Sequence, residues 1–214
     1  MQKSILIIGM GQGLSLAVAE KFGKEGYQVG MISRSPDKLA GFQLHLDKMG
    51  IVSAYEKADL SDTGQMLEAI GNLKIKLPVF GILHYNAVDA RMTPLMEETA
   101  DTLTAGFRIS VANVLEAVKA VMDDLTESQG SVLLTGGGSA NYPNAGIASI
   151  SLGKAAIQSL AYMLSESLKD KKIYVGTLTV SGWINPESKT HAPAVLAEKF
   201  WKMNKDRKVI EVTY

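Results

Sequence analysis

Short apolar runs alternate with stretches of helical periodicity along the whole chain. Ser4 to Ile8 reads as a buried strand, and YQVGMIS reads as a second one. Between them, LSLAVAEKFGKEG carries apolar residues at helical spacing and stops at Gly26. The opening part of the chain therefore predicts a strand–helix–strand unit.

The same alternation continues to the end of the chain. We expect further helices over 36–49, 62–75, 99–125, 147–168 and 193–203, and further strands in IVSAYEKADL, PVFGILHYNAV, SVLLTGGG, KIYVGTLTV and KVIEVTY. Strands that alternate with helices form a parallel, doubly wound α/β sheet with helices on both faces. We predict one such domain over residues 1–214, with ligands bound beyond the carboxyl ends of its strands.

The two longest predicted helices, 99–125 and 147–168, have apolar or small residues along much of their surface. Such faces are usually buried against a sheet or against another subunit. The sequence therefore predicts a homo-oligomer that associates through these two helices.

A glycine-rich turn joins the first strand to the first helix. Gly9, Gly11 and Gly13 precede a helix that opens at Leu14. The start of a helix leaves backbone N–H groups unpaired and carries the positive end of the helix dipole, which suits a phosphate. Glycine also lets the backbone approach a pyrophosphate closely. The turn predicts a dinucleotide site; the alternative is that these glycines only terminate a buried strand.

The second strand ends in Ser33-Arg34-Ser35, where a dinucleotide-binding fold presents a residue to the adenosine ribose. An acidic residue there would bind the 2′-hydroxyl of NAD, whereas Arg34 can pair with a 2′-phosphate and Ser33 can hydrogen-bond to it. The sequence therefore favours NADP over NAD. The alternative is that Arg34 is an ordinary solvated loop residue.

Two further strand ends reach the same edge of the predicted sheet. Asp59 and Leu60 follow the third strand, where a carboxylate or backbone group can meet the adenine. Alternatively, Asp59 or Ser61 caps the next helix. The fourth strand ends in Asn86-Ala87-Val88, and a small residue at this point lets the backbone pass close to a cofactor.

Composition narrows the class of protein further. The chain is 46% hydrophobic, enough for one large core, and Lys+Arg and Asp+Glu are both 22. No basic stretch is dense enough for a nucleic-acid footprint, so we expect no nucleic-acid partner. The chain has no cysteines and hence no disulfides. We find no apolar stretch near the roughly 20 residues of a membrane span, so we expect a cytoplasmic protein without a membrane partner.

With these residues the chain resembles the short-chain dehydrogenase/reductase family over essentially its full length. GMGQGLS is similar to the family's TGxxxGxG turn, with Ile8 in place of the threonine and Ser15 in place of the last glycine. The Ser-Arg pair, the Asp-Leu pair, the Asn-Ala-Val that stands for the family's NAG, and the helix-plus-strand ending PAVLAEKFWKMNKDRKVIEVTY also match. The resemblance implies a Rossmann-type fold, NADP as cofactor and hydride transfer to a carbonyl. The cofactor-binding residues predicted in this way are Gly9, Met10, Gly11, Gln12, Gly13, Leu14, Ser33, Arg34, Ser35, Asp59, Leu60, Asn86, Ala87, Val88, Lys154, Gly182 and Ile184.

The catalytic half departs from the family's pattern. The family's YxxxK falls on Ile150 and Lys154, its catalytic serine on about Gly137, its helix asparagine on Ser110, and its PG on Ser181-Gly182. The family's tyrosine supplies the proton in carbonyl reduction, and loss of a general acid typically costs ~10²–10⁴-fold in rate. The resemblance therefore implies that cofactor binding outlasts the standard chemistry, with Lys154 able to hold the nicotinamide ribose.

Other side chains are candidates for the missing acid. Tyr142 and Ser139 lie in the loop after the fifth strand, which borders the nicotinamide pocket in this fold. Tyr142 is the better candidate because it carries a phenol; its alternative role is to pack against a neighbour. His84 and Tyr85, at the end of the fourth strand, are expected in the core, and Trp183 is expected to pack.

Two functions remain open from the sequence. The first is an NADP-dependent oxidoreductase that acts on a small carbonyl or alcohol with a non-standard active site. The second is a catalytically inactive NADP-binding module that senses redox state or presents a surface to a partner. Both predict cofactor binding, and they differ over turnover.

Overall fold

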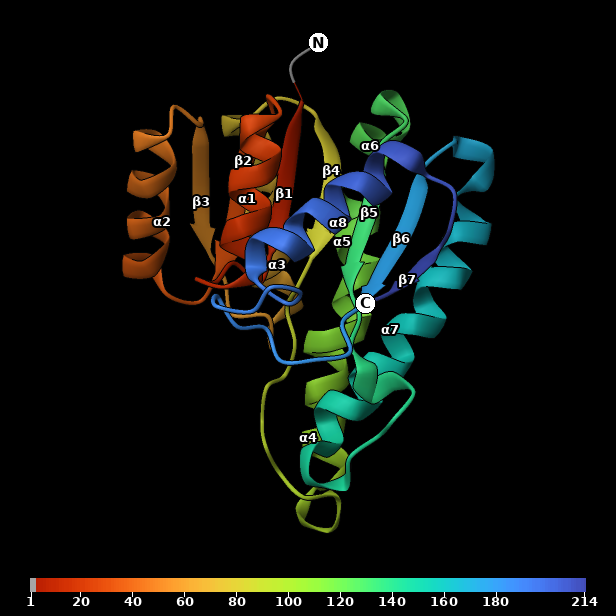
Figure 1. Ribbon diagram of the computed structural model, residues 1–214. Helices are drawn as coiled ribbons and strands as arrows, with labels where there is room; N and C mark the ends of the chain where they lie inside the picture. Colours follow the sequence, from red (N-terminus) through yellow and green to blue (C-terminus); the bar gives the residue numbers. More distant parts are fainter. Residues whose placement is uncertain (1–2) are drawn as a thin grey trace.

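Residues 3–214, which a computed structural model describes, form a seven-stranded parallel sheet. The strands lie side by side in the order β3-β2-β1-β4-β5-β6-β7 (Figure 1). Their bounds are Ser4–Ile8 for β1, Gln28–Ser33 for β2, Ser53–Lys57 for β3, Phe80–Tyr85 for β4, Ser131–Thr135 for β5, Tyr174–Thr179 for β6 and Glu211–Thr213 for β7. The strand order changes direction between β1 and β4, as in other doubly wound sheets. The predicted Rossmann-type fold is confirmed.

Helices cover both faces of the sheet, and each face has its own apolar core. One core is made with α1 (Leu14–Lys24), α2 (Pro36–Lys48) and α8 (Pro193–Asp206). The other is made with α3 (Thr63–Lys76), α5 (Asn113–Ala120), α6 (Met122–Ser128) and α7 (Ala148–Ser167). The central strands β1, β4 and β5 are buried along their whole length. Burial on both faces explains why these strands are continuous apolar runs in the sequence.

The caps of the second and third helices fix the loops that precede them. Ser35 Oγ accepts a hydrogen bond from the Lys38 N–H, and Pro36 occupies the first helical position of α2. At the start of α3, Asp62 accepts hydrogen bonds from two backbone N–H groups. The expectation that Asp59 or Ser61 caps this helix is therefore wrong. The strand β3 ends at Lys57, so Asp59 lies in the loop, where its Oδ1 accepts from the Ser61 N–H at 2.9 Å.

The single helix predicted over 99–125 is also wrong. A capping box at Thr99 starts α4 (Ala100–Phe107), a π-helical turn follows at Arg108–Ala112, and only then does α5 begin. A second break comes at Val121, whose φ of −112° and ψ of 17° separate α5 from α6. From the π-helical turn onward the apolar periodicity spans these breaks, because the turn, α5 and α6 all place apolar residues in the same core. The apolar residues Leu103 and Phe107 of α4 line a surface groove instead.

One helical stretch, Ala145–Ser167, is long and apolar enough by length and composition to cross a membrane. This corrects the expectation that the chain has no such stretch. Here α7 contacts β6 and α4, and Ala161 and Leu164 are part of the core beneath it (Figure 1). A core helix passes the same test of length and composition, so the test alone is weak evidence for a span.

Candidate functional site

The glycine turn after β1 lies at the carboxyl edge of the sheet, against the end of β4. Gly9 has a φ of +88°, and a Cβ at this position would lie 2.5 Å from the Ala87 backbone nitrogen. A Cβ on Gly11 or Gly13 would meet nothing within 4 Å. Gly9 is therefore required by packing inside the protein, whereas the two later glycines face open space.

The same turn offers unpaired donors. Among the described residues, the backbone N–H groups of 11–13 have no backbone acceptor, whereas those of Gly9 and Met10 both donate to the Ile32 carbonyl. Three N–H groups beside the start of α1, with no Cβ on two of the residues, form a cradle for an anion. The turn thus fits the pyrophosphate of a dinucleotide.

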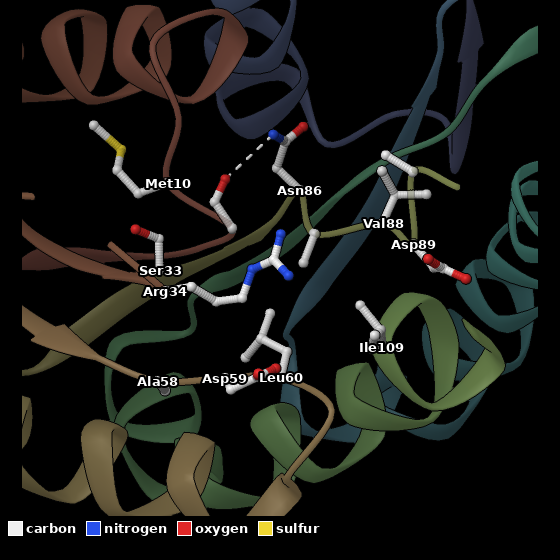
Figure 2. A pocket seen from close by; sticks show the side chains of 13 residues that line it. Met10, Ser33, Arg34, Ala58, Asp59, Leu60, Asn86, Val88, Asp89 and Ile109 are labelled. Carbon is white, nitrogen blue, oxygen red and sulfur yellow. Dashed lines mark hydrogen bonds between the residues drawn. The ribbon is translucent and has the colours of Figure 1, made fainter. Parts of the chain in front are cut away.

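A side-chain bridge fastens the turn to β4. The Asn86 amide donates to Ser15 Oγ at 2.7 Å, and this hydroxyl donates to the Gly9 carbonyl at 2.9 Å. The Asn86 amide also donates to the Gly9 carbonyl directly, at 3.5 Å, and Figure 2 marks this contact. Ser15 is only 1% exposed. The serine that replaces the family's last glycine therefore bridges the first and fourth strand ends.

Two cavities meet at Arg34. The first, about 270 Å³, lies between the ends of β1, β2 and β4, and it is lined by Gly9, Met10, Ser33, Arg34, Ala58, Asp59, Leu60, Asn86, Ala87, Val88, Asp89, Ala90 and Ile109. The second, about 570 Å³, lies over α2, and it is lined by Met10, Gly11, Gln12, Leu16, Ser33, Arg34, Ser35, Lys38, Gly41, Phe42 and His45. Figure 2 shows the guanidinium of Arg34 between the Asn86 side and the Leu60 side of the first cavity. An anionic group in either cavity would meet this cation.

Asp59 is one of two acidic residues that line the first cavity; the other is Asp89, which Arg91 pairs with. Hydrogen bonds from Ser61, first from its backbone N–H, hold the pKa of Asp59 below its ordinary value, and the nearby charge of Arg34 contributes in the same direction. The carboxylate is therefore ionised at neutral pH and is available as a hydrogen-bond acceptor.

The structure brings most of the predicted cofactor residues together. Gly13 and Leu14 line none of the cavities described here, and Leu14 is a core residue with 5% exposure. Sequence reasoning missed Lys38, Phe42 and His45, which recur at helical spacing on α2 and face the second cavity. Their i, i+4, i+7 spacing indicates that the three residues share one face of α2, but it does not indicate that this face borders a cavity.

A third cavity of about 570 Å³ holds the predicted catalytic residues. It is lined by Asn86, Val88, Thr135, Gly136, Gly137, Gly138, Ser139, Tyr142, Ile147, Ile150, Lys154, Val180, Ser181, Gly182, Trp183 and Ile184. Most of the larger side chains in this set are apolar. Tyr142 is 83% exposed and Trp183 is 89% exposed. The expectation that Trp183 packs is therefore wrong, and so is the packing alternative for Tyr142, because both side chains extend into solvent at the rim.

Lys154 reaches the inner end of this cavity from α7. Its Nζ donates to the Thr135 carbonyl at 2.7 Å, at the end of β5. Burial lowers the pKa of Lys154 to about 8. A Cβ on Gly137 would lie 3.2 Å from the Lys154 Cγ, so the stem of the lysine occupies the space beside this glycine.

The two titratable residues at the end of β4, His84 and Tyr85, are buried and neutral. His84 is fully buried on β4, with its ring 4.8 Å from that of Phe200, and burial lowers its pKa to about 3. Burial raises the pKa of Tyr85, whose hydroxyl donates to the Ile109 carbonyl at 2.6 Å. Both residues are in the core, as predicted.

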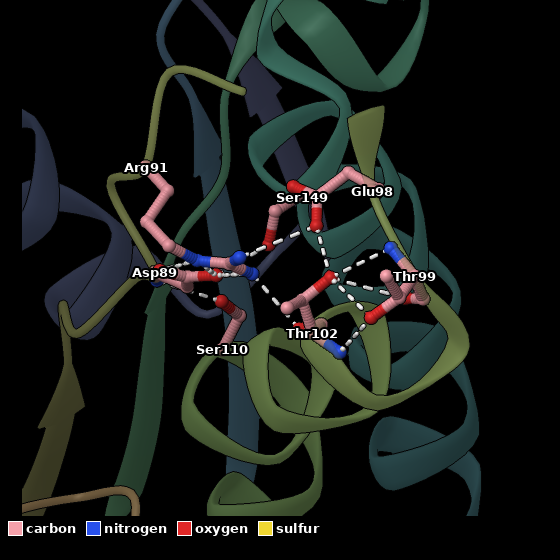
Figure 3. Close-up of polar contacts among 7 residues, drawn as sticks. All are labelled: Asp89, Arg91, Glu98, Thr99, Thr102, Ser110 and Ser149. Atoms are coloured by element: carbon pink, nitrogen blue, oxygen red, sulfur yellow. Dashed lines mark hydrogen bonds and ion pairs between the residues drawn. The ribbon is translucent and has the colours of Figure 1, made fainter. Parts of the chain in front are cut away.

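A buried ionic network holds the loop between β4 and α4 (Figure 3). Arg91 donates to both Asp89 oxygens, at distances between 2.6 and 3.0 Å, and to Glu98 at 3.2 Å. Ser149 of α7 donates to Asp89 at 2.7 Å, while Ser110 of the π-helical turn accepts from the Asp89 N–H at 2.9 Å. Burial alone would raise the pKa of Asp89, but the hydrogen bonds from Arg91 and Ser149 outweigh it and lower the pKa. Ser110, which the sequence aligned with the family's asparagine, thus takes part in this network.

Comparison with known proteins identifies the family. The model for short chain dehydrogenases matches residues 3–191, and the chain belongs to this family of oxidoreductases, whose fold binds a nicotinamide cofactor. The chain is 31% identical over 180 residues to a 3-phenylpropionate-dihydrodiol/cinnamic acid-dihydrodiol dehydrogenase of Shigella sonnei. That alignment covers 78% of this chain and 64% of the relative, so the chain spans less than two thirds of the relative's length.

Solved structures show the same fold. An alcohol dehydrogenase from the archaeon Thermococcus sibiricus, complexed with 5-hydroxy-NADP, superimposes with a TM-score of 0.85 at 18% identity and covers 100% of this chain and 96% of its own. An NADH-dependent reductase complexed with NAD gives a TM-score of 0.83 at 20% identity, covering 93% and 87%. Both nicotinamide cofactors therefore occur among proteins of this shape.

Proposed function

We propose that this protein is an NADP-dependent oxidoreductase that acts on a small, apolar carbonyl or alcohol with a non-standard active site. The observation that carries the proposal is the continuous edge formed by the glycine cradle, Arg34 and the cavity around Lys154. Gly11 and Gly13 would take the pyrophosphate, and Arg34 would take a 2′-phosphate. A bound reduced nicotinamide would supply a hydride to the substrate.

The preference for NADP rests on Arg34. The residue lies where two cavities meet and bears a cation where an NAD-specific site would carry an acid. Lys38 lines the second of these cavities and adds positive charge on the same side. Of the two acids of the first cavity, Asp59 follows β3 rather than β2 and lies on the side proposed for the adenine, and Asp89 follows β4 and is paired with Arg91.

The active site is proposed to be non-standard because Ile150 occupies the position of the family's tyrosine. Ile150 and Lys154 are one helical turn apart on α7, and both line the third cavity. Gly137 occupies the position of the family's serine, against the stem of Lys154. This site would therefore lack both the phenol and the hydroxyl that act on a carbonyl in other members.

The walls of the third cavity favour an uncharged substrate. Val88, Ile147, Ile150, Val180 and Ile184 contribute apolar surface, and Lys154 is the one charged residue among those that line it in the described part of the chain. The Shigella sonnei relative is named for dihydrodiols of phenylpropionate and cinnamic acid, which carry a carboxylate besides the hydroxylated ring, so the comparison bears only on the ring. A ring-bearing alcohol or ketone fits the same apolar walls.

The test of this function begins with binding and then measures turnover. We expect NADPH to bind more tightly than NADH in a fluorescence titration, and Arg34→Ala to weaken NADPH much more than NADH. Lys48→Ala, which removes an exposed cation from the last turn of α2, the helix that follows Arg34, is the matched control. Equal losses for both cofactors would contradict the NADP assignment. NADPH consumption with a panel of ketones, aldehydes and quinones, or NADP reduction with ring dihydrodiols, would establish the oxidoreductase.

The isoleucine at position 150 also favours a second candidate function, because its side chain cannot donate a proton. A protein without an efficient acid can still bind NADP and present a surface whose state depends on the cofactor. Tight NADPH binding without turnover of any substrate in the panel would favour this binding module over the enzyme.

We also propose that the chain self-associates through the faces of α4 and α7. A shallow groove of about 520 Å³ runs between these helices and is lined by Leu103, Thr104, Phe107, Ser149, Leu152, Gly153, Ala155 and Ala156. Phe107 is 49% exposed and Leu152 is 52% exposed, which leaves an apolar surface for a second copy of the chain.

A further inference from the structure

We propose that Lys154 is itself the proton donor of this active site, acting directly on the substrate oxygen rather than through a tyrosine. This inference rests on the oxidoreductase function proposed above and names the group that completes its reaction.

The lysine is placed for this role at the inner end of the third cavity. Its ammonium has three N–H bonds, and within residues 3–214 its recorded hydrogen bond is the one to the Thr135 carbonyl. This bond anchors the group and leaves two N–H bonds for a ligand. No Asp or Glu is among the described residues that line the cavity, so no carboxylate there holds the proton.

Competing donors are few among the residues that line the cavity. Tyr142 is the other titratable side chain of the lining, and it is largely in solvent at the rim. The hydroxyls of Thr135, Ser139 and Ser181 can donate hydrogen bonds, but an aliphatic alcohol does not give up its proton near neutral pH. His84 of β4 is neutral and fully buried, and its ring packs against Phe200 of α8, on the face of the sheet opposite to α7.

The acidity of the lysine agrees with this placement. Burial lowers the pKa of Lys154 to about 8, whereas an ordinary lysine titrates near 10.4. A general acid works best when its pKa lies near the working pH, because it is then both protonated and able to release its proton. A lysine of ordinary pKa would hold its proton too firmly.

With Lys154 as the only acid, the hydride, the electron pair and the proton of the reaction are all accounted for. In the reducing direction the carbonyl carbon gains a hydride, the electron pair of the C=O π bond moves onto the oxygen, and one N–H bond of the Lys154 ammonium breaks as its proton passes to that oxygen. The alcohol leaves, the cofactor is oxidised, and the neutral amine regains a proton from water. In the oxidising direction the neutral amine removes the hydroxyl proton.

A direct titration of the lysine, compared with the pH dependence of turnover, tests the proposal. Trace labelling of the NADP-bound protein with acetic anhydride, across a series of pH values, gives the pKa of Lys154 from mass spectrometry of its peptide. We expect a half-point near 8, with the exposed lysines well above it, and a fall in the NADPH-dependent kcat along the same curve as pH rises. The proposal would be overturned if kcat did not fall as pH rises, or if it fell at a pH far from the labelling half-point.

Two variants separate proton donation from a structural role. Lys154→Arg keeps a cation and N–H donors but cannot lose a proton at working pH, so kcat should fall by ~10²-fold or more while NADPH affinity changes only a few-fold. In Lys154→Ala, small primary amines in the buffer should restore part of kcat, with a dependence on the pKa of the added amine. Wild-type kcat in the arginine variant, or no amine rescue of the alanine variant, would overturn the assignment.

Failure of this proposal differs from failure of the proposed function. If the wild-type protein binds NADPH but turns over nothing, both fail together. If it turns over substrate and Lys154→Arg does the same, the oxidoreductase stands and Lys154 is not its acid. Tyr142→Phe then shows whether the rim phenol is the donor.

Discussion

Gly9 and Gly11 lie two residues apart in one turn, and the structure predicts that alanine at each position fails in a different way. At Gly9 an alanine must adopt a φ of +88°, with its Cβ 2.5 Å from the Ala87 nitrogen. At Gly11 the added methyl group meets nothing within 4 Å of the protein. The first substitution disturbs the fold, and the second disturbs only the space proposed for the cofactor.

The size of the Gly9 effect follows from its two parts. A positive φ costs a non-glycine residue about 1–2 kcal/mol. Forcing a methyl group into a filled site costs about 1–3 kcal/mol more, and here the obstacle is backbone rather than a flexible side chain. The sum is about 2–5 kcal/mol. A chain of this size loses about 2–4 °C of Tm for each kcal/mol, so Gly9→Ala should lower Tm by about 10 °C.

Thermal or urea unfolding of the cofactor-free protein, followed by NADPH titration, measures both parts. Gly11→Ala should change the free energy of unfolding by no more than about 0.5 kcal/mol, so its Tm should stay close to that of the wild type. It should bind NADPH more weakly, because its methyl group lies where we propose that the pyrophosphate approaches. Equal Tm values for Gly9→Ala and the wild type would refute the packing argument. Unchanged NADPH affinity in Gly11→Ala would refute the cradle.

The other predictions concern the active site and the helical face. Ile150→Tyr places a phenol one turn before Lys154, in the third cavity, so under the proposed function kcat for carbonyl reduction should rise by ~10²-fold or more relative to Ile150→Phe, which has a similar ring and no hydroxyl. Equal kcat values in the two variants would show that the phenol has no role at this position. Leu152→Asp should shift the protein to a smaller species in analytical ultracentrifugation, whereas Leu115→Asp, at 40% exposure outside the groove, should not. A monomeric wild-type protein, or the same shift in both variants, would contradict association through the groove.

The fold was predictable because its central strands are buried on both faces. Apolar runs such as SILII and SVLLT have few alternative structures once helices flank them. The position of the proposed nucleotide site was predictable from the same pattern. The carboxyl ends of parallel strands meet at one edge of the sheet, so the residues that follow the strands must be neighbours.

Local backbone geometry was harder to predict. The π-helical turn at Arg108–Ala112 and the break at Val121 do not disturb the apolar pattern, which is the signal that sequence reasoning follows. The sequence suggests a third strand that continues to about Asp59, but β3 ends at Lys57. Asp59 therefore lies in the loop, and Asp62 caps α3. The choice between two nearby acids depends on the position of a strand end, which a pattern fixes only to within a few residues.

The exposure of aromatic residues in loops could not be predicted. Trp183 and Tyr142 are apolar enough to pack, but their surroundings come from two loops whose paths the sequence does not define.

The residues of α2 that face the second cavity are a different case. Their spacing was visible, yet nothing in the sequence distinguished a cavity-facing side of this helix from a solvent-facing one.

The bridge between Ser15 and Asn86 has a consequence for the order of folding. It joins residues 71 positions apart, and the Asn86 N–H also donates to the Ile8 carbonyl at the end of β1. The loop that these contacts close contains all of β2, α2, β3 and α3. Contacts this distant in sequence form late, since the entropy of closing the loop is lost before they contribute any stability. The glycine turn therefore takes its final shape only after β4 has been synthesised and has joined β1, and a chain that is still emerging from the ribosome at the end of α3 has no finished nucleotide cradle.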